Sequence, residues 1–118
     1  MGINLHIALE TVDQKIILRL EGRLDASSAP ILDRKLSSLI GENHLYLLLD
    51  FTHVNYLSSA GMRSLLSATK QLKIKGGALL IFSLDDEVEE IIKMAGLDRI
   101  LHIFSSEKEA FQFYQNNP

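Results

Sequence analysis

Residues 50–66 have the sequence DFTHVNYLSSAGMRSLL, which predicts a buried strand that runs through a turn into an amphipathic helix. Ser58 and Ser59 stand at the junction. The first N–H groups of a helix lack partners within it and carry the positive end of its dipole, so they can hold a hydroxyl or a phosphate. Neither serine has Glu or Gln three residues on, where Gly61 and Met62 stand. No capping-box carboxylate therefore competes for those amides, and the pattern predicts a helix start open to an added anion.

The run LLLDFTHVNYLSSAGMRSLL at 47–66 resembles the signature of the STAS domain found in bacterial anti-sigma factor antagonists. In that signature a strand ends in Asp-Phe/Leu-Ser and leads through a Tyr/Phe-apolar pair to Asp-Ser-(Ser/Ala)-Gly-Leu. The phosphorylated serine follows the Asp and stands two places before the Gly, which is Ser59 here. This chain has Ser58 where the signature has Asp. The resemblance therefore implies phosphorylation at Ser59, with Ser58 as a second candidate acceptor.

The resemblance extends over nearly the whole chain. Gly22-Arg23-Leu24-Asp25 resembles the family's Gly-x-Leu/Ile-Asp turn, and Gly76-Gly77 opens a later strand as in family members. We therefore expect a single STAS domain over residues 1–118, with a frayed tail at 115–118.

Alternating and continuous apolar runs support the same fold class without the resemblance. The sequence predicts an opening hairpin, then strands that alternate with helices, and therefore an α/β fold with a mixed, mostly parallel sheet of about five strands and about four helices. The expected strands are 4–10, 15–21, 45–51, 78–82 and 100–104; a turn is expected at 22–25, and helices are expected to start near 28, 59, 86 and 107. Strand ends and helix starts share one edge of such a sheet, so the Asp25 turn and the Ser59 turn are expected to meet.

Composition limits the classes of function. The 118 residues are 47% hydrophobic and 23% charged, enough for one core, and we expect a monomer when the chain is not bound to a partner. A net charge of −3 argues against nucleic-acid binding, and the absence of cysteine excludes disulfides and thiol nucleophiles. No apolar run is long enough to span a bilayer and the start lacks a secretory signal, so we expect a cytoplasmic protein without membrane insertion.

Positive charge is concentrated in one stretch. Residues 51–84 contain no Asp or Glu but carry Arg63, Lys70, Lys73 and Lys75, whereas the remaining residues, with 8 basic and 15 acidic side chains, carry a net −7. Lysines late in a helix complement its dipole, which is one explanation. Arg63 stands in the first turn and is not explained in that way, so we expect it to face a partner.

Enzyme chemistry is not indicated. The sequence has no Gly-x-Ser-x-Gly, and no His or Asp is linked to the serines by spacing. His53 is interpreted as a half-exposed turn residue, and His6, His44 and His102 lack metal-binding spacing. Gly76-Gly77 lacks the Gly-Lys-Ser/Thr of a phosphate loop. We therefore expect no catalytic residue, no metal and no cofactor.

The resemblance implies a docking surface around the phosphorylation site. Asp25 could either cap the turn before the first helix or lie at that surface. Met62 belongs to the apolar stripe of its helix and is expected mainly to pack. The expected partner-binding residues are Asp25, Ser58, Ser59, Ala60, Gly61, Met62 and Arg63.

The function implied by the resemblance is that of an anti-sigma factor antagonist. Such a protein binds an anti-sigma factor serine kinase while its serine is unphosphorylated, and a serine phosphatase resets it. One alternative is a STAS accessory module of a lipid or anion transporter, which would need no phosphorylation. A second is a small nucleotide-binding or hydrolytic protein.

Overall fold

The computed structural model describes residues 4–116, which form a single α/β unit. In chain order the elements are β1 (Leu5–Val12), β2 (Lys15–Leu24), α1 (Ala29–Gly41), β3 (Tyr46–Leu57), α2 (Ser59–Ile74), β4 (Ala78–Phe82), α3 (Asp86–Met94), the 3-10 helix η1 (Leu97–Arg99), β5 (His102–Phe104) and α4 (Glu107–Asn116).

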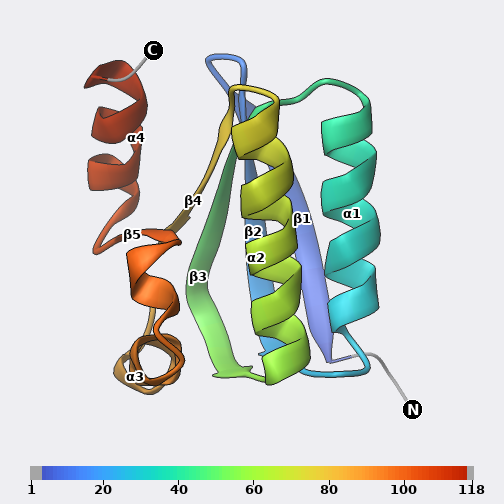
Figure 1. Ribbon diagram of the computed structural model, residues 1–118, viewed down its shortest axis with the longest axis vertical. Helices are drawn as coiled ribbons and strands as arrows, with labels where there is room; N and C mark the ends of the chain where they lie inside the picture. Colours follow the sequence, from blue (N-terminus) through green and yellow to red (C-terminus); the bar gives the residue numbers. More distant parts are fainter. Residues whose placement is uncertain (1–3, 117–118) are drawn as a thin grey trace.

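The sheet has five strands in the order β1-β2-β3-β4-β5 (Figure 1). β1 and β2 form an antiparallel hairpin, and each later neighbour pairs in parallel. Parallel neighbours need a crossover, and the helices supply it. The expected mixed, mostly parallel sheet with four α-helices is therefore confirmed.

The helices divide unequally between the two faces of the sheet. Successive strand residues point to opposite faces, and this separates the buried side chains into two clusters. Leu47 and Leu49 of β3 join the larger cluster with residues of α1, α2 and α3, whereas Leu48 joins Ala110 and Tyr114 of α4. One face thus carries three helices, and the other carries α4 alone.

Two strands run further than the sequence predicts. The segment expected as a turn at 22–25 belongs largely to β2, which ends at Leu24, and β3 continues to Leu57 instead of ending at Phe51. The cause is pairing between β2 and β3, which extends to the pair Leu24 and Leu57 through two irregularities in register. His53 therefore lies exposed within a strand, and its interpretation as a turn residue is wrong.

The carboxyl-terminal third also differs from expectation in detail. η1 was not expected, and it shortens the last strand to three residues. Gly96 ends the preceding helical turn with a φ of 74°. α4 runs through Asn116, and residues 117–118 of the expected frayed tail lie outside the described part of the chain.

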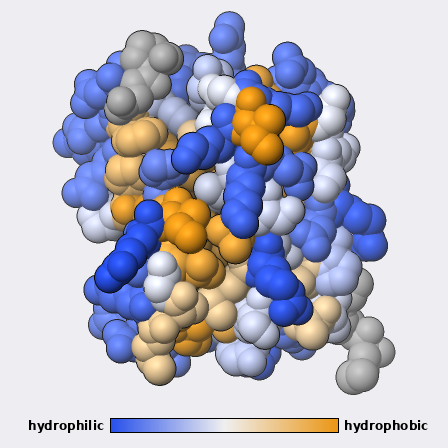
Figure 2. Space-filling view, viewed as in Figure 1, coloured by the Kyte–Doolittle hydropathy of each residue, from blue (hydrophilic) through white to orange (hydrophobic). Residues whose placement is uncertain are grey.

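The face with three helices has an uneven surface. Figure 2 shows apolar side chains gathered over the α2 and α3 side of this face. Met62, Leu84 and Leu97 are partly buried apolar residues that pack on the core beneath the helices. Ile74 at the end of α2 is 86% exposed among lysines. The start of α2 lies at the opposite end of the helix from these lysines, and it positions the candidate site.

Candidate functional site

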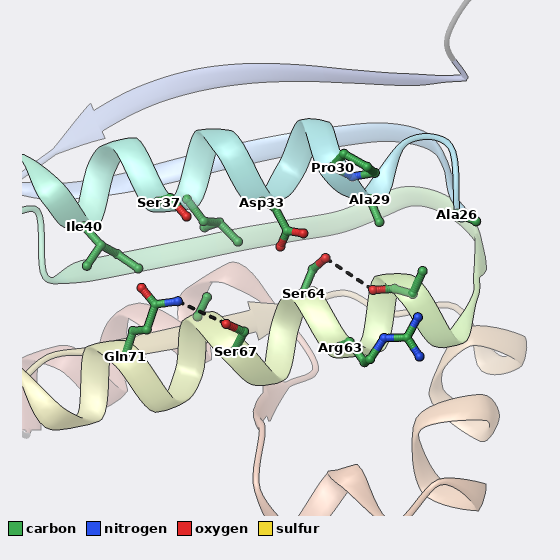
Figure 3. A pocket seen from close by; sticks show the side chains of 13 residues that line it. Ala26, Ala29, Pro30, Asp33, Ser37, Ile40, Arg63, Ser64, Ser67 and Gln71 are labelled. Atoms are coloured by element: carbon green, nitrogen blue, oxygen red, sulfur yellow. Dashed lines mark hydrogen bonds between the residues drawn. The ribbon is translucent and has the colours of Figure 1, made fainter.

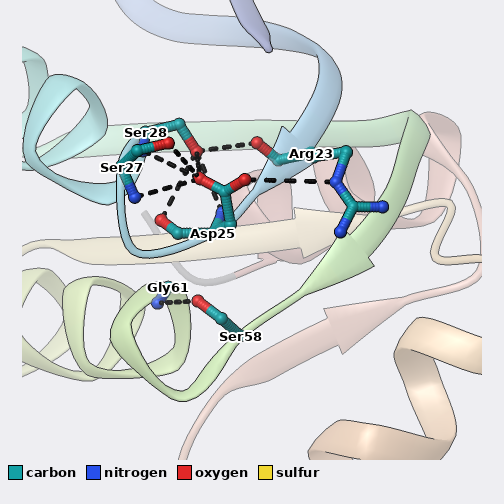
Figure 4. A network of polar contacts seen from close by, with 6 residues as sticks. All are labelled: Arg23, Asp25, Ser27, Ser28, Ser58 and Gly61. Atoms are coloured by element: carbon teal, nitrogen blue, oxygen red, sulfur yellow. Dashed lines mark hydrogen bonds and ion pairs between the residues drawn. The ribbon is translucent and has the colours of Figure 1, made fainter. Parts of the chain in front are cut away.

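The ends of β2 and β3 bring the two expected turns together. Leu24 and Leu57 are register partners, and the Ser58 N–H donates to the Leu24 carbonyl oxygen over 2.9 Å. Asp25 follows the first strand directly, and Ser59 begins α2 after the second. The expectation that both turns share one edge of the sheet is confirmed (Figure 4).

Ser58 caps α2. Its backbone is extended, with φ −92° and ψ 171°, and its Oγ accepts the Gly61 N–H over 3.1 Å. Ser and Asp are nearly equivalent as N-caps. Ser58 thus does the capping that the Asp of the signature could do, but without its negative charge, and it is the one residue between β3 and α2.

Ser58→Ala is expected to lower the free energy of unfolding by about 1 kcal/mol, because it leaves the Gly61 N–H without its cap. Ser59→Ala serves as the matched control, since the Ser59 hydroxyl caps nothing in the described chain, and it should change stability little. Urea unfolding of the two variants measures the difference. Equal losses in both would show that the cap contributes nothing.

Ser59 is the first residue of α2, and its side chain is exposed. Within residues 4–116 its hydroxyl makes no hydrogen bond. The expected position of Ser59, in the first helical turn with an accessible hydroxyl, is confirmed. Of the two neighbouring serines, only Ser59 therefore presents an unengaged oxygen to an approaching partner.

The residues after Ser59 hold the helix start against the strands. A Cβ on Gly61 would lie 2.8 Å from Leu24 Cγ and 2.8 Å from Leu57 Cδ1, so only glycine allows α2 to begin this close to the strand ends. Met62 is half-buried against the core, which confirms that it mainly packs. Among residues 58–63, the side chains of Ser59 and Arg63 are the exposed ones.

The Asp25 carboxylate organises its own turn. Its Oδ1 accepts the Ser27 hydroxyl at 2.8 Å and the N–H groups of Ser27 and Ser28 at 3.1 and 3.0 Å. The Ser27 hydroxyl, followed by the Ser28 N–H, holds the pKa of Asp25 below its usual range, so the group is ionised at neutral pH. Oδ2 lies 4.0 Å from Arg23 Nε. The interpretation as a turn residue fits this geometry.

Ser28 has a role in this turn that the sequence did not indicate. It occupies the N-cap position of α1 but makes no capping hydrogen bond with its side chain; its buried Oγ instead accepts the Asp25 N–H at 2.9 Å and lies 2.7 Å from the Arg23 carbonyl oxygen. The side chain of Arg23 also lies over the ring of Tyr56, 4.1 Å from its centroid. These contacts join residues that a sequence pattern does not link.

A groove of about 500 Å³ separates α1 from α2 and opens at the site (Figure 3). Asp33 lines it from α1, and Arg63 and Ser67 line it from α2. In the described part of the chain Arg63 has no ion-pair partner, although Asp33 lines the same groove. The first turn of α2 contains no acidic residue. Positive charge beside Ser59 is therefore not neutralised within the helix.

A second polar cluster lies on the face that carries α4. Arg19 contacts Glu10 and lies 2.8 Å from both Asp50 and Glu107, which links β1, β3 and α4. Burial alone would raise the pKa of Asp50, but hydrogen bonds from Thr52 and Arg19 outweigh it and leave that pKa below its usual range. This cluster links elements distant in the sequence, and none of its residues belongs to the turns at Asp25 and Ser59.

Within residues 4–116, no group of three or more His, Asp or Glu side chains is placed to hold a metal ion. No described helix combines the length and the apolar character needed to cross a membrane.

The five-stranded mixed sheet, with an exposed serine at the start of α2, defines a small α/β module with an accessible hydroxyl at one edge. The chain belongs to the STAS domain family, whose model matches residues 6–110. The anti-sigma-B factor antagonist of Listeria monocytogenes is 28% identical over 109 residues, which are 92% of this chain and 95% of that protein.

Solved structures give the same fold. The anti-sigma factor antagonist SpoIIAA in its unphosphorylated form superposes with a TM-score of 0.80 at 20% identity, over 94% of this chain and 97% of SpoIIAA. SpoIIAA of Bacillus in its phosphorylated form superposes with a TM-score of 0.71 at 20% identity, over 92% of this chain and 99% of that chain. These likenesses confirm the STAS fold for the described residues.

Proposed function

We propose that this protein is an anti-sigma factor antagonist that binds an anti-sigma factor serine kinase while Ser59 is unphosphorylated and is switched off when Ser59 is phosphorylated. Binding would release the sigma factor from the kinase. The observation that carries the proposal is the exposed, unengaged hydroxyl of Ser59 beside the capping Ser58. The names of the relatives and the existence of SpoIIAA in two phosphorylation states support it.

The chain is the substrate of the switch and not its catalyst. No His or carboxylate in the described residues is hydrogen-bonded to Ser59, so a general base must come from elsewhere. The kinase supplies ATP and Mg²⁺, the γ-phosphoryl group passes to Ser59 Oγ, and ADP and a proton leave. A serine phosphatase then resets the protein by hydrolysis of the phosphoester.

Mass spectrometry tests this assignment. The protein is incubated with a purified serine kinase of the anti-sigma factor class, ATP and Mg²⁺, and the modified residue is located by fragmentation. Ser59 should carry the phosphate in wild type and in Ser58→Ala, and Ser59→Ala should stay unmodified. Phosphate located on Ser58, or capture of transporter subunits in place of a kinase from the source cell, contradicts the proposal.

Arg63→Glu is expected to slow association with the kinase by about tenfold at low ionic strength, because Arg63 is an exposed cation at the docking edge and such charges act mostly on the encounter rate. Stopped-flow mixing at several salt concentrations measures the effect, which should shrink as salt rises.

Lys108→Glu is the control for this prediction, since Lys108 is exposed on α4, which packs on the other face of the sheet. Its association rate should match wild type. If Arg63→Glu also associates at the wild-type rate at low salt, Arg63 does not face the partner.

A further inference from the structure

Ser59 and Arg63 lie on the same face of α2. Residues four apart on a helix are neighbours on its surface, and long side chains there lean toward the helix N-terminus. Figure 3 shows the Arg63 side chain extending back toward the start of α2, away from the middle of the groove. Its guanidinium group therefore reaches toward the turn that contains Ser59.

The surroundings leave Arg63 available to an anion on Ser59. The only charged residue that lines the groove with it is Asp33, and within residues 4–116 the two make no ion pair. Asp25 on the same edge uses Oδ1 within its own turn. Ser58, in place of the Asp of the signature, adds no competing carboxylate next to Ser59. A phosphate on Ser59 would thus have one unpaired cation on its own face of α2 and no acidic residue in the first turn of that helix.

We propose that Arg63 binds the phosphate of phosphorylated Ser59 within the same chain, so that modification both adds a dianion to the docking edge and removes the docking cation from it. This inference rests on the proposed phosphorylation of Ser59. Arginine presents two parallel N–H donors to phosphate oxygens, which favours the dianion over the monoanion. The pairing needs no movement of the backbone, because both side chains already share one exposed face.

The second pKa of the phosphate on Ser59 measures its pairing with Arg63. The second pKa of phosphoserine is about 6, and a cation that binds the dianion lowers it. We expect Arg63→Gln to raise this pKa by about 0.5 unit relative to the phosphorylated parent chain, a size consistent with an exposed pair one helical turn apart. Arg63→Lys should lie between the two, since lysine keeps the charge but lacks the planar fork.

The experiment uses the full chain with phosphoserine incorporated at position 59 during synthesis and follows its phosphorus resonance against pH by NMR. Lys70→Gln is the matched control, since Lys70 is also exposed on α2 but lies three turns from Ser59. A rise in pKa in Arg63→Gln, with little change in Lys70→Gln, supports the pairing. An unchanged pKa in Arg63→Gln, or equal shifts in both variants, overturns it.

Because phosphoserine is built in without the kinase, this experiment does not depend on the proposed function. Failure of the kinase to modify Ser59 would refute the proposed switch and leave the pairing result intact. A null NMR result would refute the pairing and leave the switch intact. Circular dichroism of each variant confirms that α2 is folded before its titration is interpreted.

Discussion

Ser59→Asp is expected to bind the anti-sigma factor serine kinase at least about tenfold more weakly than wild type, and Ser59→Ala is expected to bind persistently and to resist release by ATP. Each 1.4 kcal/mol of lost binding free energy is about tenfold in affinity. A carboxylate at Ser59 would enter the interface without a matching cation on the partner, and such like-charge contact and desolvation can cost several kcal/mol. Tenfold is a lower bound, because a carboxylate carries less charge than a phosphate.

Titration of the two Ser59 variants against the kinase, with and without ATP, measures the effect. Gln112→Asp is the control, because it adds the same charge to an exposed position of α4, on the other face of the sheet. It should bind as wild type, as should Ser58→Ala once its lower stability is allowed for. Equal affinity of Ser59→Asp and wild type would remove Ser59 from the docking surface.

Ser59→Asp should nevertheless fold normally. The helix start stabilises negative charge, and Ser59 is exposed, so the change disturbs no buried contact. Far-UV circular dichroism should therefore match wild type. Weaker binding in a folded variant separates a change of surface charge from a loss of structure.

The position of Ser59 could be predicted because the information is local. A buried strand, a turn and an amphipathic helix follow one another in residues 50–66, and the helix period fixes which side chains face the core. Which of Ser58 and Ser59 caps α2 could not be predicted from the sequence. Both are acceptable N-caps, and only the contact of Ser58 Oγ with the Gly61 N–H shows which one caps.

Contacts between distant residues were not predictable from the pattern. Arg19 joins Glu10, Asp50 and Glu107, which come from three other elements. No periodicity in one segment encodes such a meeting. The same holds for the extension of β3, because its last residues are strand only through their pairing with β2.

At Gly22 the expected backbone conformation is correct, but the expected secondary structure is wrong. The sequence predicts a tight turn in which Gly22 is free to take positive φ. Its φ is indeed 123°, but Gly22 lies within β2, next to an irregularity in its register with β3. The Arg23 N–H donates to the Asn4 carbonyl oxygen over 2.7 Å, which brings the two strands close at this point. The glycine thus serves strand pairing beside the Asp25 turn.

Gly22→Ala is expected to lower the free energy of unfolding by about 2–6 kcal/mol, because it combines two costs. A side chain at this φ is strained by about 1–3 kcal/mol, and a Cβ would overlap the Asn4 carbonyl oxygen, so the backbone of β1 would have to shift. For a domain whose stability is about 5–15 kcal/mol, this is a large fraction.

Urea unfolding of Gly22→Ala against Gly41→Ala gives the measurement with its matched control. Gly41 is the last residue of α1, it is not among the positive-φ glycines, and a Cβ there would meet no atom within 4 Å. Gly41→Ala should therefore be neutral or more stable by up to about 1 kcal/mol, because alanine is the better helix former. Similar unfolding midpoints for the two variants would mean that β1 and β2 separate at Gly22 with little loss of stability. A large loss in Gly22→Ala alone establishes that this close approach of β1 holds the strand end from which the Asp25 turn begins.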